Sequence, residues 1–354
     1  MSPACQIREL TLPPGNRAVV LENDLLAATI LPEQGADIYA LVYKPRGVDV
    51  LWKSGRLQAG RRAVPPGEPS LSAWLNTYSG GWQVLFPNGG AANAHQGLTH
   101  SFHGEAAVSA WDYTVPSAGP RAAEVRLSVT LAHSPFRLER TLRLEAGRPV
   151  LQLHEQVSNT SAAVQAYICG QHPAFGAPLI GPACRIDTGA SFLLADPAAS
   201  GPASPLTAGS RYPWPVPAAA GRAAAVNTLP DQATPRRLMA YFTDFEATAW
   251  YALTNTALGF GVGLAWPRVV YPYAWFWQEL RATPDFPWNG QAYVMAIEPA
   301  TCFPAHGLAA VARQTGTVRS LAPGAAISVD LCAAFYDGSR GVARLAPDGT
   351  VQLK

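Results

Sequence analysis

Short runs in which apolar and polar residues alternate fill most of this 354-residue chain. Such alternation turns one face of a β-strand toward a core, and these runs are rich in β-branched and aromatic residues. Gly, Pro and Asn separate the runs at short spacing, and the clearest helical pattern is a short one over Gly307–Gln314. We therefore predict an all-β fold, a large antiparallel β-sandwich formed as a single domain over residues 1–354.

The predicted strands follow one another closely along the chain. They are Ala18–Leu31, Asp37–Tyr43, Val48–Lys53, Ala106–Val115, Glu124–Ala132, Arg137–Leu144, Val150–Ser158, Ala163–His172, Leu238–Phe242, Ala247–Leu253, Gly259–Ala265, Val269–Trp277, Gln291–Glu298, Val318–Leu321 and Ala326–Tyr336. Two stretches, Gly60–Ser70 and Asp196–Arg236, are irregular. The second is long for a loop, so we expect it to be functional or to cross one sheet, not to link domains.

Composition narrows the classes of partner. Hydrophobic residues make up 48% of the chain, charged residues make up 14%, and the net charge of +2 comes without a basic run. Nucleic acid is therefore not an expected partner. No apolar stretch has the length of a membrane span, and the first residues lack the pattern of a signal peptide. Five scattered cysteines indicate reduced thiols, so we expect a cytoplasmic protein, either a monomer or a homodimer.

Two segments end an apolar strand pattern with a proton-transfer group followed by proline. In QAYVMAIEPAT the group is Glu298, and in AVQAYICGQHPAFG it is His172. A carboxylate held rigid by the next proline suits a fixed general base. Imidazole titrates near neutral pH and can act as acid or base. The alternatives are a solvated glutamate and a hydrogen-bonded structural histidine.

A Gly- and Asn-rich stretch from Gly80 to His103 carries His95, His100 and His103. Imidazoles can bind zinc, iron or copper, but this spacing matches no defined metal pattern. We therefore predict no metal and no cofactor, and we expect loop histidines that line a polar cleft. His103 stands out because Gly104 follows it, and a glycine lets a ligand approach the backbone.

Aromatic residues are dense from Tyr271 to Trp277, and Gln278 and Glu279 follow them. Aromatic faces stack on the apolar faces of sugar rings, although core packing explains the same run. Trp74, Tyr78 and Trp82 add aromatic residues before the glycine-rich stretch. The chain has no G-x-S-x-G, Walker loop, G-x-G-x-x-G or HExxH motif. Histidine and carboxylate on a β scaffold therefore remain as candidates for proton transfer without a cofactor.

Five segments, in order along the chain, resemble the aldose 1-epimerase (galactose mutarotase-like) superfamily. They are LFPNGG at Leu85–Gly90, FHGEAAVSAW at Phe102–Trp111, GQHPAFG at Gly170–Gly176, AIEPAT at Ala296–Thr301 and LAPGAAISVDL at Leu321–Leu331. The resemblance covers roughly residues 21–336. It implies a β-supersandwich that interconverts the α and β anomers of a small-molecule carbohydrate.

The resemblance also implies roles for single residues. Glu298 would take the proton of the anomeric hydroxyl, His172 would protonate the ring oxygen, and His103 would hydrogen-bond the sugar. The family's loop arginine is missing here, so Gln83 or Asn88 could bind hydroxyls instead. No arginine pair for a sugar phosphate is evident, although Arg281 and Arg185 could contribute to binding one. The other expected sugar-binding residues are Trp82, Trp275, Trp277 and Gln278.

Two other functions fit the same residues. One is a non-catalytic carbohydrate-binding or sensor protein, because a fold does not fix a function. The other is a glycoside-active enzyme, in which Glu279 and Glu298 would flank a glycosidic bond.

Overall fold

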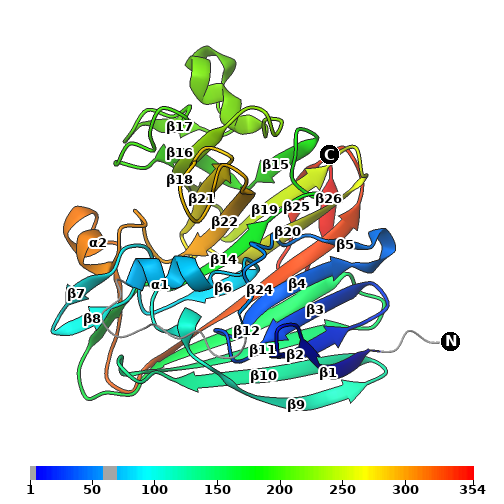
Figure 1. Cartoon of the computed structure of the whole chain (residues 1–354), viewed down its shortest axis with the longest axis vertical. Helices are drawn as coiled ribbons and strands as arrows, with labels where there is room; N and C mark the ends of the chain where they lie inside the picture. The colour runs from blue at the N-terminus through cyan, green and yellow to red at the C-terminus, as the bar shows by residue number, and fades with distance from the viewer. Residues whose placement is uncertain (1–4, 59–69) are drawn as a thin grey trace. The chain divides into compact units, whose positions relative to one another are not determined.

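The computed structural model describes residues 5–58 and 70–354, and about half of them lie in strands (Figure 1). The chain divides into two compact units. Unit 1 comprises Met1–His172 and Thr301–Leu331, and unit 2 comprises Pro173–Ala300 and Cys332–Lys354. The predicted all-β class of antiparallel sheets is confirmed. The single domain over residues 1–354 stays a prediction.

Unit 1 contains two antiparallel sheets. Their orders are β1-β2-β3-β4-β6-β14 and β12-β11-β10-β9. The elements are β1 (Gln6–Leu12), β2 (Asn16–Glu22), β3 (Leu26–Leu31), β4 (Asp37–Tyr43), η1 (Lys44–Arg46), β5 (Val48–Asp49), α1 (Ser70–Thr77), β6 (Trp82–Leu85), β7 (Asn93–His95), β8 (Leu98–His100), η2 (Ala106–Val108), β9 (Asp112–Gly119), β10 (Ala122–Thr130), β11 (Phe136–Glu145), β12 (Val150–Asn159), β13 (Gln165–Tyr167), β14 (Gly170–Phe175), α2 (Leu308–Gln314), β23 (Arg319–Leu321) and β24 (Ala326–Asp337).

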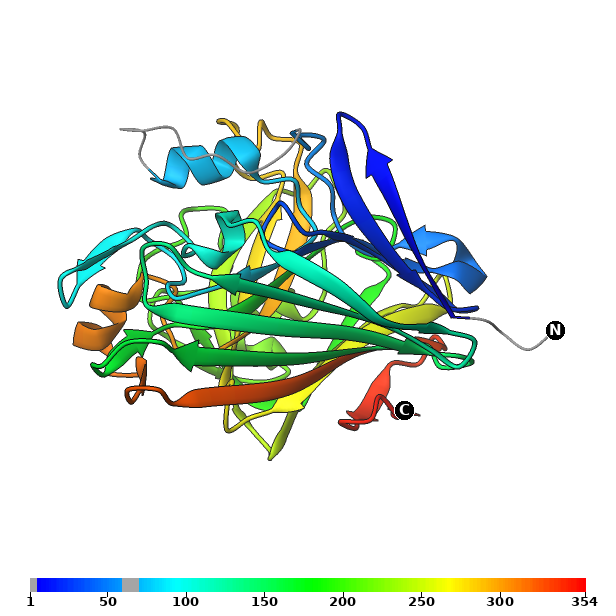
Figure 2. The ribbon, with the colours of Figure 1, turned by 90° about the horizontal axis from the view of Figure 1, so that it is seen from below.

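The core of unit 1 lies between these two sheets. Figure 2 shows the β1–β2 hairpin, in blue, above the layer that contains β9 to β12. Along β10 and β11, buried residues alternate with exposed or half-buried ones, as expected when one face of a strand meets a core. Phe86 and Phe136 meet in this core, with ring centroids 4.9 Å apart.

Unit 2 also contains two antiparallel sheets, with the orders β22-β21-β18-β16-β17 and β15-β19-β20-β24. Its elements are β15 (Cys184–Thr188), β16 (Ala190–Ala195), β17 (Arg211–Pro213), η3 (Ala218–Asn227), β18 (Arg236–Phe245), β19 (Thr248–Asn255), β20 (Phe260–Pro267), β21 (Tyr273–Leu280), β22 (Tyr293–Ala300), β25 (Val342–Leu345), β26 (Val351–Leu353) and the end of β24. Phe245 of β18 packs against Trp266 of β20, with ring centroids 5.5 Å apart. Every residue of β22 is buried, so this strand is covered on both faces.

Several predicted strands differ from the observed ones. Ala18–Leu31 is a hairpin, because the Asn23 side-chain oxygen accepts hydrogen bonds from the N–H groups of Leu25 and Leu26 and turns the chain. Ala106–Val115 begins with the 3₁₀ turn η2, and Ala163–His172 is split between β13 and β14. The stretch Asp196–Arg236 contains β17 and η3, while residues 60–69 of the other irregular stretch lie outside the described residues.

The predicted strand ends at Glu298 and His172 are wrong. Glu298 lies inside β22, which continues to Ala300, and His172 lies inside β14, which continues to Phe175. Proline has no N–H, but a strand directs only alternate N–H groups toward any one neighbour, so it can accept a proline at some positions. Both groups are therefore held by strand backbone on either side.

Candidate functional site

One group of candidate residues is centred on His103 in unit 1. His103 follows β8 with a positive φ of 59°, and Gly104 has a φ of 84°. A Cβ at Gly104 would lie 2.3 Å from the carbonyl oxygen of Phe86, so only glycine allows these two backbone segments to approach. This close packing fixes the position of the His103 ring.

Hydrogen bonds to Gly90 also fix the tautomer of His103. The Gly90 N–H donates to Nδ1 of His103 at 3.1 Å, and the His103 N–H donates to the Gly90 carbonyl at 3.1 Å. Because Nδ1 accepts a hydrogen bond, the proton of the neutral ring lies on Nε2. His103 therefore presents one N–H donor.

His172 and Trp74 lie next to His103, and Tyr78 lies next to His172. The ring centroids of His103 and His172 are 5.5 Å apart, in an edge-to-face arrangement. Trp74 lies 4.8 Å from His103, and Tyr78 lies 5.8 Å from His172. The indole N–H of Trp74 is buried without a hydrogen-bond partner within the described residues. Helix α1 supplies Trp74, and the Ser70 hydroxyl ties the start of this helix to the N–H of Phe102 at 3.0 Å.

Burial sets the charge of both histidines. It lowers the pKa of His172 to about 4. Burial, and then the positive charge of a protonated His172, lower the pKa of His103 well below its ordinary value. An ion is disfavoured when it loses water, so both rings are neutral at pH 7 in the protein without a ligand.

A separate group of candidate residues is centred on Glu298 in unit 2. Burial raises the pKa of Glu298 well above its ordinary value. Glu298 pairs across strands with Trp275 of β21, which in turn pairs with Tyr241 of β18. Directly paired residues of antiparallel strands point to the same face, so these three side chains form one row.

Tyr251, whose hydroxyl is affected by the charge of Glu298, is a residue that the sequence analysis missed. Its hydroxyl is buried and has no hydrogen-bond partner among the described residues. Burial, and then the negative charge of Glu298, raise the pKa of Tyr251 well above its ordinary value. Tyr251 lies in an aromatic strand with no pattern that separates it from core tyrosines, so the sequence gives no signal for it.

The other aromatic candidates of unit 2 differ in exposure. Trp275 is buried, whereas Trp277 is half-buried and contacts Trp288, with ring centroids 5.4 Å apart. Gln278 lies on the opposite face from both tryptophans and is fully buried, and its amide nitrogen lies 3.6 Å from the sulfur of Met295. Trp277 is the one of these three with surface that a ligand can reach.

Three predicted sugar-binding residues of unit 1 are buried and bonded to protein groups. Trp82 donates to Gln171 Oε1 at 2.9 Å, and Gln83 donates to Asp37 Oδ2 at 2.9 Å. The Asn88 side chain donates two hydrogen bonds to carbonyls and accepts two, one of them from the N–H of Leu308 at the start of α2. Because these four bonds use the whole amide, we infer that Asn88 holds the loop in place.

Glu279, the second carboxylate of the glycoside-active alternative, is hydrogen-bonded to groups of the protein. Its oxygens accept hydrogen bonds from the N–H groups of Ala282 and Thr283 and from the Thr283 hydroxyl at 2.6 Å. Glu279 lies four residues along β21 from Trp275, the partner of Glu298, which is about 13 Å of strand. Glycosidase carboxylates lie about 5–9.5 Å apart, so this pair does not suit glycoside cleavage.

The three loop histidines do not form a metal site. Within residues 5–58 and 70–354, no three His, Cys, Asp or Glu side chains are grouped closely enough to hold a metal ion. His95 and His100 lie on the β7–β8 hairpin, and His103 lies beyond it. Neither α-helix in the described part of the chain is long and apolar enough to cross a membrane.

Comparison with solved structures shows the fold. A Klebsiella pneumoniae protein assigned provisionally as an aldose 1-epimerase matches with a TM-score of 0.71 and 18% identity, over 94% of this chain and 84% of that one. A galactose mutarotase-like protein from Clostridium acetobutylicum matches with a TM-score of 0.62 and 14% identity, over 94% and 99% of the two chains. One from Lactobacillus casei gives 0.57 and 20%, over 90% and 100%.

At these identities the matches show the fold alone. They confirm the resemblance in fold to galactose mutarotase-like proteins. No curated protein matches the sequence. The model of one family, described as a domain of unknown function (DUF4432), matches residues 14–333. This chain, a β-sandwich protein with the galactose mutarotase-like fold, therefore belongs to the DUF4432 family.

Proposed function

We propose that this protein is an aldose 1-epimerase that interconverts the α and β anomers of an aldose or an aldose derivative. The observation that carries the proposal is the His103–His172 pair, two buried imidazoles whose ring centroids are 5.5 Å apart. Trp74 and Tyr78, which are buried beside them, are aromatic side chains of the kind that pack against sugar rings. The mutarotase-like fold supports the same class of substrate.

In the proposed reaction, Glu298 takes the proton of the anomeric hydroxyl while His172 gives a proton to the ring oxygen. The bond between C1 and the ring oxygen breaks, and the open-chain aldehyde forms. Rotation about the C1–C2 bond exposes the other face of the carbonyl, and the reverse transfers close the ring. His172 loses a proton and Glu298 gains one on opening, and closure restores both. Because each step is a proton transfer, side chains supply all of the chemistry.

His103 has a supporting role in this proposal. Its Nε2–H is available as a donor because Nδ1 is occupied by the N–H of Gly90. A neutral donor beside the ring oxygen stabilises the charge that develops there without competing for the proton of His172. His103 is therefore proposed to orient the sugar.

The reactive form has an ionised Glu298 and a protonated His172. Burial acts against both charges, since it raises one pKa and lowers the other to about 4. The form with one proton on the pair dominates between these two pKa values, and it contains the reactive arrangement as a minor state. We therefore expect kcat/KM to be constant between about pH 4 and the pKa of Glu298, and to fall outside that range.

The test is anomer exchange measured by saturation-transfer NMR on a panel of aldoses. Glu298→Gln and His172→Asn should each keep the melting temperature and sugar binding but lose exchange by about 10²–10⁴-fold. The variant that combines Glu298→Gln and His172→Asn should lose little more exchange than the slower of the two single variants, because both groups act in one step. Glu279→Gln is the matched control and should keep exchange.

Two outcomes would contradict the proposal. Glu298→Gln with wild-type exchange would show that Glu298 is not the base. A wild-type protein that binds a sugar but exchanges none of the panel would be a carbohydrate-binding or sensor protein.

A further inference from the structure

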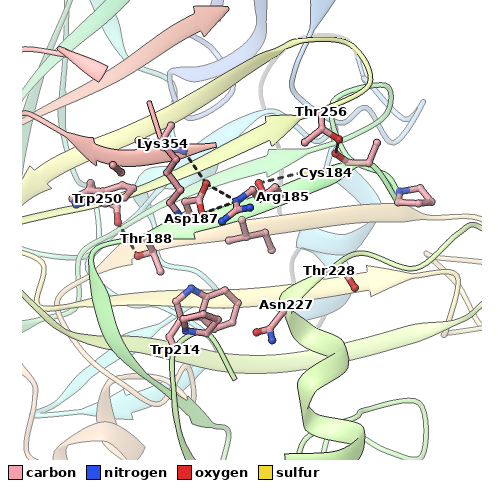
Figure 3. Close-up of a pocket in the computed structure, with 16 residues that line it drawn as sticks. Cys184, Arg185, Asp187, Thr188, Trp214, Asn227, Thr228, Trp250, Thr256 and Lys354 are labelled. Atoms are coloured by element: carbon pink, nitrogen blue, oxygen red, sulfur yellow. Dashed lines mark hydrogen bonds and ion pairs between the residues drawn. The ribbon is translucent and has the colours of Figure 1, made fainter. Parts of the chain in front are cut away.

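A cavity of about 490 Å³ in unit 2 contains none of the residues proposed for epimerisation. It lies beside β15 and is lined by Trp214 and Trp250. Asn227 at the end of η3, Val342 at the start of β25 and Lys354 after β26 also line it. Its volume falls within the range of about 300–1,000 Å³ that small-molecule sites occupy. Figure 3 shows Trp214 and Asn227 on one side of it and a cluster of Arg185, Asp187 and Lys354 on the other.

The charged cluster carries an excess of positive charge. Asp187 is only 5% exposed and accepts hydrogen bonds from Nε of Arg185 at 3.0 Å, from Nζ of Lys354 at 2.7 Å and from the N–H of Val342 at 2.9 Å. Two cationic side chains thus share one carboxylate. Arg185 and Lys354 remain 47% and 43% exposed, so both can reach a ligand.

Arg185 has donors left for that ligand. Its ion pair with Asp187 uses Nε, and both terminal nitrogens of the guanidinium are additional donors. A guanidinium that is held at Nε and open at its ends presents a planar fork, which matches the oxygens of a carboxylate or phosphate group.

Close packing makes the cluster rigid. Gly341 has a φ of 89°, and a Cβ there would lie 2.4 Å from Asp187 Oδ2 and 2.7 Å from Arg185 Nε, so this backbone packs closely against the ion pair. A Cβ at Gly189 would lie 2.5 Å from Nε1 of Trp250, so a second glycine seats that indole. Preorganised groups lose little freedom when a ligand binds.

The aromatic wall is also held in place. Trp214 is half-buried, and its ring meets Phe242 edge-to-face at 4.8 Å. The backbone N–H of Trp214 donates to the Ser191 carbonyl at 2.9 Å. The indole of Trp214 offers apolar surface for a ring, and the cationic cluster on the other side of the cavity (Figure 3) offers charge for an anionic substituent. We propose that this cavity binds a monosaccharide-sized organic anion, with its carboxylate or phosphate on Arg185 and Lys354 and its ring against Trp214.

The experiment is isothermal titration of the full chain with glucose 6-phosphate, glucuronate and benzoate, with glucose and inorganic phosphate as controls for the ring and the anion alone. We expect at least one of the three ring-bearing anions to bind more tightly than both controls, and to bind more weakly as salt rises. Which of the three binds identifies the anion and the ring. If none binds more tightly than the controls, the proposal is wrong.

Variants separate this cavity from the proposed epimerase site. Arg185→Gln should weaken the binding about tenfold or more, as expected for a lost charge-assisted contact. Trp214→Leu, which leaves the ion cluster intact, should also weaken it. Glu298→Gln should leave the binding unchanged, with the melting temperature of each variant as the folding control. The assignment to this cavity would be overturned if Arg185→Gln and Trp214→Leu both bind as tightly as the wild type. It would also be overturned if only Glu298→Gln loses binding.

Discussion

Gly90 and His103 exchange two hydrogen bonds, one from each backbone N–H. The Gly90 N–H donates to the His103 ring at 3.1 Å, and the His103 N–H donates to the Gly90 carbonyl at 3.1 Å. Gly90 has a φ of 81°, and a Cβ there would lie 1.9 Å from the carbonyl oxygen of Ala305. The tautomer of His103 therefore depends on a backbone position that only glycine can occupy.

Gly90→Ala should consequently lower both stability and anomer exchange. The added methyl group would clash with the carbonyl of Ala305, and a movement of residue 90 away from it would break the bond that holds Nδ1 of His103. Gly97→Ala is the matched control, because Gly97 has a φ of 80° but no atom within 4 Å of a Cβ. Both variants carry the backbone strain of a positive φ, about 1 kcal/mol. Melting temperature and NMR exchange should fall clearly further for Gly90→Ala, and equal losses would show that strain alone matters.

Tyr251→Phe should leave the protein at least as stable as the wild type but lower kcat/KM for anomer exchange about tenfold. Among the residues that the structure describes, the buried Tyr251 hydroxyl has no hydrogen-bond partner, which costs stability, and the charge of Glu298 acts on it. We interpret it as a donor kept for the ionised carboxylate or for the sugar. Urea unfolding and exchange kinetics test this together. A variant with lower stability and unchanged exchange would assign the hydroxyl a structural role.

His172 should make the protein less stable in mild acid. Its pKa is lowered to about 4 in the folded protein, against an ordinary value of 6.5, so between these values the unfolded chain binds more protons. Stability due to this group therefore rises with pH across this window, by about 3 kcal/mol in total at about 1.4 kcal/mol per unit.

The measurement is the free energy of unfolding of the wild type and of His172→Asn, at several values from pH 4 to pH 7. The difference between the two proteins isolates His172 from Glu298. The raised pKa of Glu298 acts in the opposite direction, because its contribution to stability is lost as pH rises above 4.5. Parallel curves for the two proteins would contradict a lowered pKa of His172.

Local sequence patterns predicted much of the fold. Asp37–Tyr43 was predicted with the bounds of β4, and Gly307–Gln314 differs from α2 by one residue, because alternation and turn residues act over short distances. Helix α1, with the sequence SLSAWLNT, was missed because half of its residues are Ser, Asn or Thr, which favour caps and turns over helix interiors. The hydrogen bonds of Trp82, Asn88 and Glu279 depend on distant partners or on loop geometry, which no local pattern encodes.

The last prediction concerns the buried ion pair of Arg140 and Glu155. Nε of Arg140 lies 2.9 Å from Oε1 of Glu155, and the Arg140 side chain is fully buried. Glu155 also accepts a hydrogen bond from the Gln171 amide at 2.6 Å, and Gln171 precedes His172 in β14. The pair therefore fixes the strand that carries the proposed acid.

Glu155→Gln should destabilise the protein by about 3–5 kcal/mol, because it leaves the charge of Arg140 buried without an anion. Replacing both residues with apolar ones, Arg140→Met with Glu155→Leu, should recover much of that loss, since no charge then remains buried. The matched control is Glu139→Gln on β11, which removes a surface pair with Arg137 at 3.2 Å and should cost about 1 kcal/mol or less. Urea unfolding measures all three variants. If the Arg140→Met, Glu155→Leu double variant is less stable than Glu155→Gln, the prediction is wrong. The ion pair would then stabilise the fold more than apolar side chains do in its place.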